Sequence, residues 1–473
     1  MCTHARWARI LAHSTSPLNI AVVIRVYNTM GRHLVDFAPR EEGKVGIYVC
    51  GPTVQSEPHV GHGRYAVAFD VIRRYLIWRG FDVTYVSNVT DIEDKIIAAA
   101  AETGDTVEEL AQRMGERFAN SFERLGVLSP DIEPKATEHI PEMIDLITRL
   151  IDKGLAYPRD GDVYFSVKTF EQYGRLSGRR PDELRAGYRI AVDETKEDPL
   201  DFALWKSAKP GEPSWNSPWG PGRPGWHIEC SGMASKYLGD DFDIHGGGLD
   251  LVFPHHENEV AQSEGATGET FARYWLHNGM VNLGGEKMAK STGQIVDLEE
   301  ILDRHGGRAL RMVYVRANYR SPIEYSRELL AEAEESLDRL DRFRERLTPG
   351  EPDPAAIAAF TEVMDDDFGT PQAVSLMFDL VRDGNRVLDE GGDGSAIAGA
   401  VETIVGVLGL DDAEPAPVSA GGVSNDEIER LIALRDGARA ARDFDRADEI
   451  RDRLAAVGVA IEDGPDGTRW LRK

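Results

Sequence analysis

Two histidines three residues apart could act together on a phosphate group. His59 and His62 lie in the segment H-V-G-H on either side of Gly61, where an apolar run gives way to an amphipathic segment. The N–H groups at a helix N-terminus attract anions, and a glycine lets the backbone approach a ligand closely. Two imidazoles at such a turn could donate to charge that develops on an α-phosphate. Taken alone, such a pair is more often a surface or capping feature of a helix.

A second set of residues could bind a metal ion. Cys50 and Cys230 are far apart in the sequence, whereas His255 and Glu259 are spaced i, i+4 within F-P-H-H-E-N-E, on one face of a predicted helix. Two thiolates, an imidazole and a carboxylate form a donor set that suits Zn²⁺. The long-range spacing is a weak signal by itself, because a free cysteine is usually a small buried apolar residue.

Two lysines in a glycine-flanked loop form the third candidate. Lys287 and Lys290 lie within E-K-M-A-K-S-T-G, residues 286–293. A mobile loop of this kind can close over a triphosphate and neutralise charge in the transition state. The same composition is typical of any solvated turn, so the loop alone does not indicate a site.

The surrounding elements predict an α/β fold. Residues 45–49 form an apolar run typical of a strand, and residues 68–76 carry apolar side chains at helical spacing before Gly80, where a helix end is expected. A β-branched run follows at 83–86, so the unit is β-α-β with a right-handed crossover. The histidine turn then lies at the carboxyl end of a parallel strand, where open α/β sheets bind ligands.

Length and composition restrict the function. The 473 residues allow two to four domains, and the formal net charge of −27 argues against a protein that coats nucleic acid nonspecifically. An RNA recognised by its shape needs only a local basic face. Three cysteines give no disulfide framework and predict a reducing cytoplasm. No apolar run is long enough to span a membrane, and residues 1–23 lack the core of a signal peptide.

The order of the three motifs resembles that of the class I aminoacyl-tRNA synthetases. H-V-G-H is similar to the HIGH motif of that class, and K-M-A-K-S is similar to its KMSKS loop. Further blocks resemble the cysteinyl-tRNA synthetases within the class, and the similarity runs from about residue 24 to residue 473. These blocks are Y-V-C-G-P-T-V, N-V-T-D-I-E-D-K-I, G-R-P-G-W-H-I-E-C-S, H-G-G-G-L-D-L-V-F-P-H-H-E-N-E and E-D-G-P-D-G-T-R-W.

The resemblance implies a fold and an order of domains. We expect an α/β fold in which the Rossmann-like parallel sheet of a class I synthetase carries a connective insertion and is followed by a helical bundle and a small C-terminal α+β anticodon-binding module. The expected divisions are a disordered extension (1–23), the first half of the catalytic domain (24–131), the insertion (132–218), the second half (219–279), the KMSKS-loop and stem-contact region (280–325), the bundle (326–410), a linker (411–424) and the anticodon-binding module (425–473).

The resemblance also implies an activity and its ligands. A cysteine–tRNA ligase activates L-cysteine with ATP, accompanied by Mg²⁺, and transfers the cysteinyl group to the 3′ end of cysteine tRNA. One Zn²⁺ per chain would select the substrate thiolate, and serine would be rejected without an editing domain because a hydroxyl is far harder to deprotonate than a thiol. We expect a cytoplasmic monomer that does not bind membranes.

Individual residues acquire roles through the same resemblance. The catalytic residues would be His59, His62, Lys287 and Lys290, and ATP would be bound by His59, Gly61, His62 and Lys290. The metal ligands would be Cys50, Cys230, His255 and Glu259. The substrate cysteine would be surrounded by Gly51, Thr53, Thr90, Trp226 and Asp250, and the anticodon would meet Phe444, Asp448, Arg451 and Asp463.

Two alternatives remain open from the sequence. Mycothiol ligase, a paralogue that joins activated cysteine to an amino sugar, shares the nucleotide and metal motifs but ends before the anticodon-binding module, so residues 425–473 favour tRNA as the acceptor. A non-catalytic RNA-binding or regulatory relative is the other alternative, because Ala289 and Gln294 depart from the family's loop pattern. Both lysines and Ser291 are present in that loop, and we expect its chemistry to be intact.

Overall fold

The computed structural model describes residues 23–180, 196–283, 286–287, 295–411, 435, 451, 459–464 and 467–472. The chain divides into two compact units, residues 1–411 and residues 412–473. All but the last residue of the expected N-terminal extension lies outside the described residues. Among the helices that the structure describes, none is long and apolar enough to cross a membrane.

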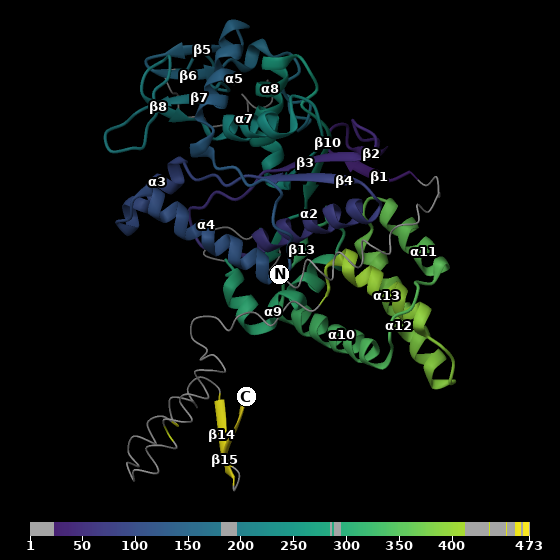
Figure 1. Cartoon of the computed structure of the whole chain (residues 1–473). Helices are drawn as coiled ribbons and strands as arrows, with labels where there is room; N and C mark the ends of the chain where they lie inside the picture. Colours follow the sequence, from purple (N-terminus) through teal and green to yellow (C-terminus); the bar gives the residue numbers. More distant parts are fainter. Residues whose placement is uncertain are drawn as a thin grey trace. The chain divides into compact units, whose positions relative to one another are not determined.

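A four-stranded parallel sheet forms the centre of the first unit (Figure 1). Its strands, in spatial order, are β10 (Ala272–Asn278), β9 (Phe242–Gly248), β3 (Lys44–Val49) and β4 (Asp82–Ser87). The first half of the fold contributes β3 and β4 and the second half contributes β9 and β10, so the strand order reverses between β3 and β9. Such a reversal opens a crevice at the carboxyl ends of the strands, where ligands bind.

Helix α2 (Val60–Trp78) joins β3 to β4 and confirms the predicted β-α-β unit. Val67, Val71 and Tyr75 recur at helical spacing and are almost fully buried, so this face of the helix packs into the core. Gly80 follows the helix end at φ +91°, a backbone conformation that glycine adopts without strain. The helix therefore ends where the sequence predicts.

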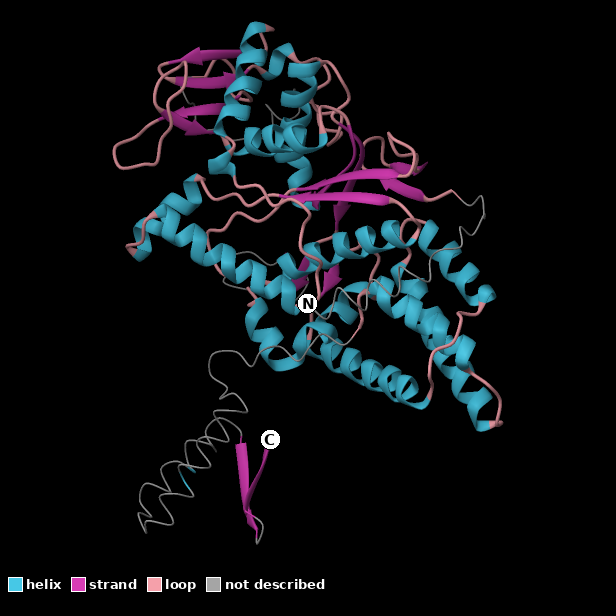
Figure 2. Ribbon diagram, in the orientation of Figure 1, coloured by secondary structure: helices cyan, strands magenta, loops and turns pink. Residues whose placement is uncertain are grey.

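Three helices from later in the chain cover the other face of the sheet (Figure 2). These are α5 (Ile140–Asp152), α7 (Trp226–Leu238) and α8 (Glu257–Thr267), which pack on one another, and α7 also packs on β3. With α2 on the opposite face, the parallel sheet is buried on both sides, as its apolar strands require.

An antiparallel sheet lies between β4 and α7 in the sequence. Its strands are β5 (Ala156–Arg159), β6 (Asp162–Phe165), β7 (Phe202–Ser207) and β8 (Gly222–Pro224), which extends the sheet past residue 218. The alternation of Val163, Phe165 and Val167 predicts a strand through all three residues, but β6 ends at Phe165. Val167 instead begins a short 3-10 turn, because its N–H donates to the carboxylate of Asp201 (2.9 Å) and not to a neighbouring strand.

The helical region follows the catalytic halves. Its helices are α9 (Leu298–Val315), α10 (Arg327–Arg346), α11 (Pro354–Asp365), α12 (Thr370–Asp389) and α13 (Ser395–Leu408). The sequence predicts a helix at 308–314, which in the structure is the second part of α9, whose chain bends at Gly306 (φ +73°). Sequence periodicity does not identify α13, because Gly399 and Gly406 interrupt an otherwise apolar segment that is buried on more than one side.

The remaining elements are short or peripheral. The sequence predicts a helix at 107–125, and α4 (Val107–Arg124) confirms it, with the side chain of Thr106 capping its first turn. The other elements of the first unit are β1 (Arg25–Asn28), β2 (His33–Asp36), α3 (Asp94–Thr103), η1 (Ala136–Glu138), η2 (Val167–Thr169), η3 (Leu249–Leu251), η4 (Val252–His256), β11 (Val281–Leu283), β12 (Glu286–Lys287) and β13 (Ile323–Glu324). In the second unit, the sequence predicts short strands at 459–461 and 468–471, and β14 (Val459–Gly464) and β15 (Gly467–Arg472) confirm them as an antiparallel hairpin.

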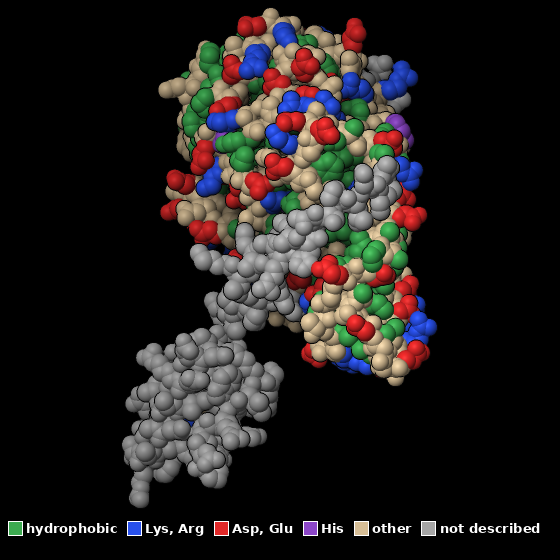
Figure 3. Space-filling view, turned by 45° about the vertical axis from the view of Figure 1, so that its right-hand side comes forward, with side chains coloured by type: hydrophobic (Ala, Val, Ile, Leu, Met, Phe, Trp, Pro, Cys, Tyr) green, Lys and Arg blue, Asp and Glu red, His purple; other side chains and the backbone are tan. Residues whose placement is uncertain are grey.

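Charged side chains of both signs are interspersed over the face drawn in Figure 3. Many form pairs on the surface, such as Arg149 with Asp145 and Arg382 with Asp379. Exposed pairs of this kind contribute little to stability.

A buried ion cluster joins α2 to α9. Asp70 and Arg311 have fully buried side chains that pair with each other, and Arg74 Nε donates to the same carboxylate oxygen of Asp70 (2.7 Å). Arg311 Nε also donates to the carbonyl of Leu408 at the end of α13 (2.7 Å). Burial alone would raise the pKa of Asp70, but the two guanidinium groups hold it below its usual range. The cluster therefore ties the helical region to the helix that follows β3.

Replacing Asp70 with asparagine tests this cluster. Asp70→Asn is expected to lower the free energy of unfolding of the first unit by about 3–5 kcal/mol, because two buried guanidinium groups lose their counter-charge. Urea unfolding of the variant measures the change. The matched control is Asp145→Asn, which removes an exposed carboxylate paired with Arg149 and should change stability by less than about 0.5 kcal/mol. Equal unfolding midpoints for the two variants would contradict the prediction.

Candidate metal and nucleotide site

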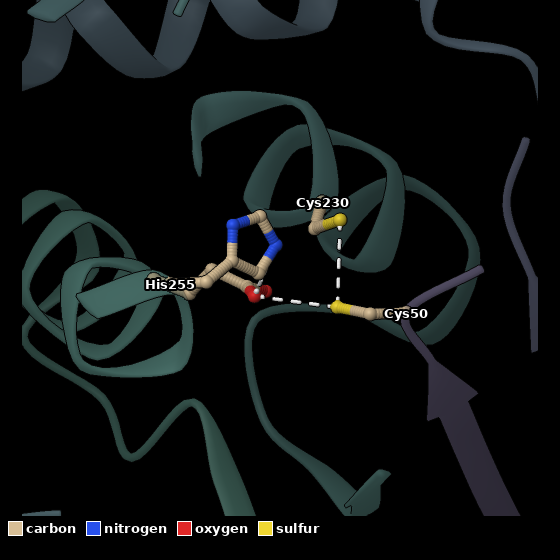
Figure 4. Close-up of side chains that lie close together, drawn as sticks. Cys50, Cys230 and His255 are labelled. Carbon is tan, nitrogen blue, oxygen red and sulfur yellow. Dashed lines mark hydrogen bonds and ion pairs between the residues drawn. The ribbon is translucent and has the colours of Figure 1, made fainter. Parts of the chain in front are cut away.

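The four predicted metal ligands lie together at the carboxyl ends of β3 and β9 (Figure 4). Cys50 directly follows β3 and donates its N–H to the carbonyl of Gly246 in β9 (3.0 Å). Cys230 is on α7, whereas His255 is in the π-helical turn η4 and Glu259 is in the first turn of α8. One donor atom of each side chain lies within 4.8 Å of the others, and all four residues are buried.

The distances within this metal cluster (Cys50, Cys230, His255 and Glu259) are short for groups without a cation. The Sγ atoms of Cys50 and Cys230 are 3.5 Å apart and unbonded, and Glu259 Oε1 lies 3.4 Å from Cys50 Sγ and 3.2 Å from His255 Nε2. Burial raises the pKa of the Cys50 thiol and lowers the pKa of His255. A neutral imidazole and two thiols that lose their protons to a cation are what Zn²⁺ requires, so the residues fit this metal.

Further histidines contact the metal cluster. His227 Nδ1 lies 2.9 Å from His255 Nδ1, and His245 Nε2 lies 2.8 Å from Glu259 Oε2. Groups that bond the outer atom of a ligand fix its orientation toward a metal. No pattern in the sequence singles out His227 or His245, although His227 is in the same block as Cys230 and His245 opens H-G-G-G. His245 and His256 also form a second donor group with Cys50 and Glu259.

Three of the residues predicted to surround the substrate lie on the segments that follow β3 and β4. Thr53 and Thr90 form a parallel β-bridge, and the N–H of Gly51 donates to Asn88 Oδ1 (2.9 Å). A Cβ atom at Gly51 would lie 1.6 Å from the carbonyl oxygen of Asn88, so only glycine fits there. These residues therefore border the metal cluster on the β4 side.

The other two predicted substrate residues come from the second half of the fold. The ring of Trp226 packs on the ring of His255, with centroids 4.2 Å apart. Asp250 is exposed in η3, directly after β9. Trp226 therefore contacts a residue of the metal cluster. Asp250 lies at the surface instead, on the short helix that directly follows β9.

His59 and His62 lie at the start of α2, and the structure gives both a capping role. His59 Nδ1 accepts from the N–H of Gly61 (3.1 Å), His62 Nδ1 accepts from the N–H of His59 (3.1 Å), and the two rings stack with centroids 3.7 Å apart. Because both Nδ1 atoms accept, each neutral ring carries its proton on Nε2. Capping thus sets the tautomer in which each Nε2 can donate to a ligand.

The lysine loop is anchored next to the histidine turn. Lys287 is in β12, which pairs with β11, and Lys290 lies outside the described residues. After the loop, the carbonyl of Val296 accepts from the N–H of Val60 (3.1 Å), and the N–H of Leu298 donates to the carbonyl of Pro58 (3.1 Å). The chain therefore returns from the loop to the two residues that flank His59.

Little of the predicted anticodon site belongs to the described residues. Phe444 and Asp448 lie outside them. Arg451 is exposed, and Asp463 belongs to β14. Their proposed contacts with bases remain predictions.

Comparison with known proteins agrees with the fold and the site. A model of the class I (C) tRNA synthetase catalytic domain matches residues 36–335, a DALR domain matches residues 359–410, and a cysteinyl-tRNA ligase anticodon binding domain matches residues 424–470. The parallel sheet, the histidine turn and these matches define a class I aminoacyl-tRNA synthetase.

Curated relatives narrow this class to one family. The cysteine–tRNA ligase of Thioalkalivibrio sulfidiphilus is 50% identical over 459 residues, which cover 95% of this chain and 100% of the relative. That of Geobacter metallireducens is 50% identical over 483 residues, with coverage of 95% and 100%. The chain belongs to the cysteine–tRNA ligase family, whose members are ATP-dependent aminoacyl-tRNA synthetases. The predicted family and enzyme class are confirmed.

A solved structure supports the fold alone. Methionyl-tRNA synthetase of Mycobacterium tuberculosis, in complex with methionyl-adenylate, superposes with a TM-score of 0.56 at 16% identity and covers 82% of this chain and 94% of that chain. The expected α/β fold with a helical region is thereby confirmed.

Proposed function

We propose that this enzyme activates L-cysteine with ATP to form cysteinyl-adenylate and then transfers the cysteinyl group to the 3′ end of cysteine tRNA. The observation that carries the proposal is the burial of two thiols, an imidazole and a carboxylate within 4.8 Å of one another. Cys50 of this group lies where the chain leaves β3 for the histidine turn, beside β9. We further propose that the enzyme acts as a cytoplasmic monomer, a state that size-exclusion chromatography tests.

Cys50, Cys230, His255 and Glu259 would hold one Zn²⁺. When bound, the ion would act as a Lewis acid that favours the thiolate of cysteine over the hydroxyl of serine. His227 and His245 would keep His255 and Glu259 in the orientation that the ion needs. Gly51, Thr53, Thr90, Trp226 and Asp250 would surround the rest of the amino acid.

Adenylation needs no covalent nucleophile from the enzyme. The carboxylate of cysteine attacks the α-phosphorus of ATP, which is bound with Mg²⁺, and pyrophosphate leaves. His59 and His62 would donate from Nε2 to the α-phosphate oxygens as their negative charge grows, and the backbone at Gly61 would let the phosphates approach. Lys287 and Lys290 would neutralise the departing pyrophosphate. Positioning and electrostatic stabilisation thus account for the rate.

The acceptor is the point on which the alternatives differ. The match of residues 424–470 to a cysteinyl-tRNA ligase anticodon binding domain favours tRNA over an amino sugar. Cysteine-dependent ATP–pyrophosphate exchange by the purified enzyme, with serine as the control amino acid, tests the first step, and charging of a cysteine tRNA transcript tests the second. An enzyme without cysteine-dependent exchange would support the non-catalytic alternative instead.

Lys290 is predicted to act on the transition state of adenylation. Lys290→Ala should slow cysteine-dependent exchange by about 100- to 1,000-fold and change the KM for cysteine much less, because the lost charge is needed only as pyrophosphate departs. Steady-state exchange kinetics measure both constants. Lys153→Ala removes an exposed lysine at the end of α5 and is the matched control, expected to leave both constants unchanged. Equal rates for Lys290→Ala and the wild type would refute this role.

A further inference from the structure

The carboxylate of Glu229 is buried without a hydrogen-bond partner among the described residues. Its exposed fraction is 0%, and neither Oε1 nor Oε2 receives a hydrogen bond. Burying a carboxylate is costly unless a cation or several donors approach it. An ionised Glu229 would therefore need a positively charged partner, and no described residue forms an ion pair with it.

Glu229 shares a face of α7 with two residues next to the proposed substrate position. Trp226, Glu229 and Cys230 are spaced i, i+3 and i+4, which places them on the same side of the helix. Trp226 packs on His255, and Cys230 belongs to the metal cluster. Glu229 thus lies beside the metal cluster.

Polar side chains also lie on the side of the metal cluster toward β4. Cys230 Sγ lies 3.7 Å from Asn88 Oδ1, and Asn88 Nδ2 donates to Thr90 Oγ1 (3.2 Å). Thr90 is also a polar neighbour of Glu229, while Asp91 and Glu93 on the same segment add negative charge. A polar, negatively charged region therefore begins next to Cys230.

Cations close to this region are engaged elsewhere. Lys206 and Arg223 both pair with Asp94, and Arg223 also pairs with Glu212 (3.2 Å). Lys95 Nζ lies 5.5 Å from the ring centre of Trp226. None of these groups forms an ion pair with Glu229 in the described structure. The region therefore favours a cation that arrives with a ligand.

We propose that Glu229, together with Thr90, binds the α-ammonium group of the substrate cysteine. The inference rests on the proposed function, in which the metal cluster holds the cysteine sulfur. Only the Cβ and Cα atoms of cysteine separate its sulfur from its ammonium nitrogen, so this nitrogen must lie close to the metal ligands. Glu229 is the residue next to Cys230 and would make the enzyme select an amino thiol over a simple thiol.

Three thiols that differ in one group each test this assignment. L-cysteine has a thiol, an ammonium and a carboxylate, whereas cysteamine lacks the carboxylate and 3-mercaptopropionate lacks the ammonium. Binding of each to the zinc-loaded full chain is measured by titration calorimetry. Glu229→Gln should weaken the binding of cysteine and cysteamine by about 30-fold and change that of 3-mercaptopropionate by less than about threefold. Glu229→Asp, which keeps the charge, should retain part of the preference.

The control separates direct contact from the local field. Glu93→Gln makes the same change of charge on the neighbouring segment and should alter the affinity of each thiol by less than about threefold. An equal loss for all three thiols in Glu229→Gln, or no loss for any, would overturn the inference. Cysteine-dependent pyrophosphate exchange by the wild type tests the proposed function separately. If the wild type catalyses this exchange but the Glu229 variants bind every thiol normally, the proposed function holds and only the role of Glu229 is refuted.

Discussion

Cys230→Ser is expected to lower cysteine-dependent pyrophosphate exchange by at least about 100-fold. Even the loss of a residue that only orients a metal ligand lowers metal affinity or activity by about 10- to 100-fold. A serine hydroxyl does not replace a thiolate as a zinc ligand, so the variant should lose both its zinc and its affinity for cysteine. ATP binding should survive, because the histidine turn and the lysine loop are formed by other segments. Elemental analysis, calorimetry with cysteine and nucleotide binding measure these properties.

The control for this variant is the remaining cysteine of the chain. Cys2→Ser makes the same chemical change at a residue that is not one of the four predicted ligands and should retain zinc and exchange activity. Purified wild-type enzyme should contain about one zinc ion per chain, because the four ligands form one site. A zinc-free wild-type enzyme with full activity would contradict the metal assignment.

The local parts of the site could be predicted from the sequence. An apolar run, the turn H-V-G-H and a helical period specify β3 and α2, because each interaction involves residues close in the chain. At His59 the structure combines two roles that the sequence leaves as alternatives. Capping and ligand binding are alternatives in the sequence, yet in the structure capping sets the tautomer that ligand binding would use.

The non-local parts could not be derived from periodicity or spacing. Cys50 and Cys230 meet because α7, which carries Cys230, packs on β3, and no pattern near either cysteine specifies that packing; the family resemblance supplied it. His245 and Glu229 were missed for the same reason, since their partners, or lack of partners, depend on which elements surround them. The early end of β6 likewise depends on Asp201, which is distant in sequence.

Removing every residue after Val423 is expected to separate the two half-reactions. The second compact unit begins at residue 412 and the matched anticodon binding domain at residue 424, so the first unit keeps its sheet, metal cluster and helices. Cysteine-dependent exchange should stay within about twofold of the wild type. Charging of cysteine tRNA should fall by at least about 100-fold, because each base contact contributes about 1–3 kcal/mol and several would be lost together.

A point substitution and a changed tRNA make this prediction specific. Arg451 is exposed in the second unit, and Arg451→Ala should cost about 1–3 kcal/mol in tRNA charging and nothing in exchange if its guanidinium meets a base edge. A transcript with an altered anticodon should be charged poorly by the full chain, whereas the truncated protein should treat both transcripts alike. If truncation leaves charging intact, residues 424–470 do not read the anticodon; if the full chain acylates glucosaminyl-inositol and ignores tRNA, the acceptor is the amino sugar.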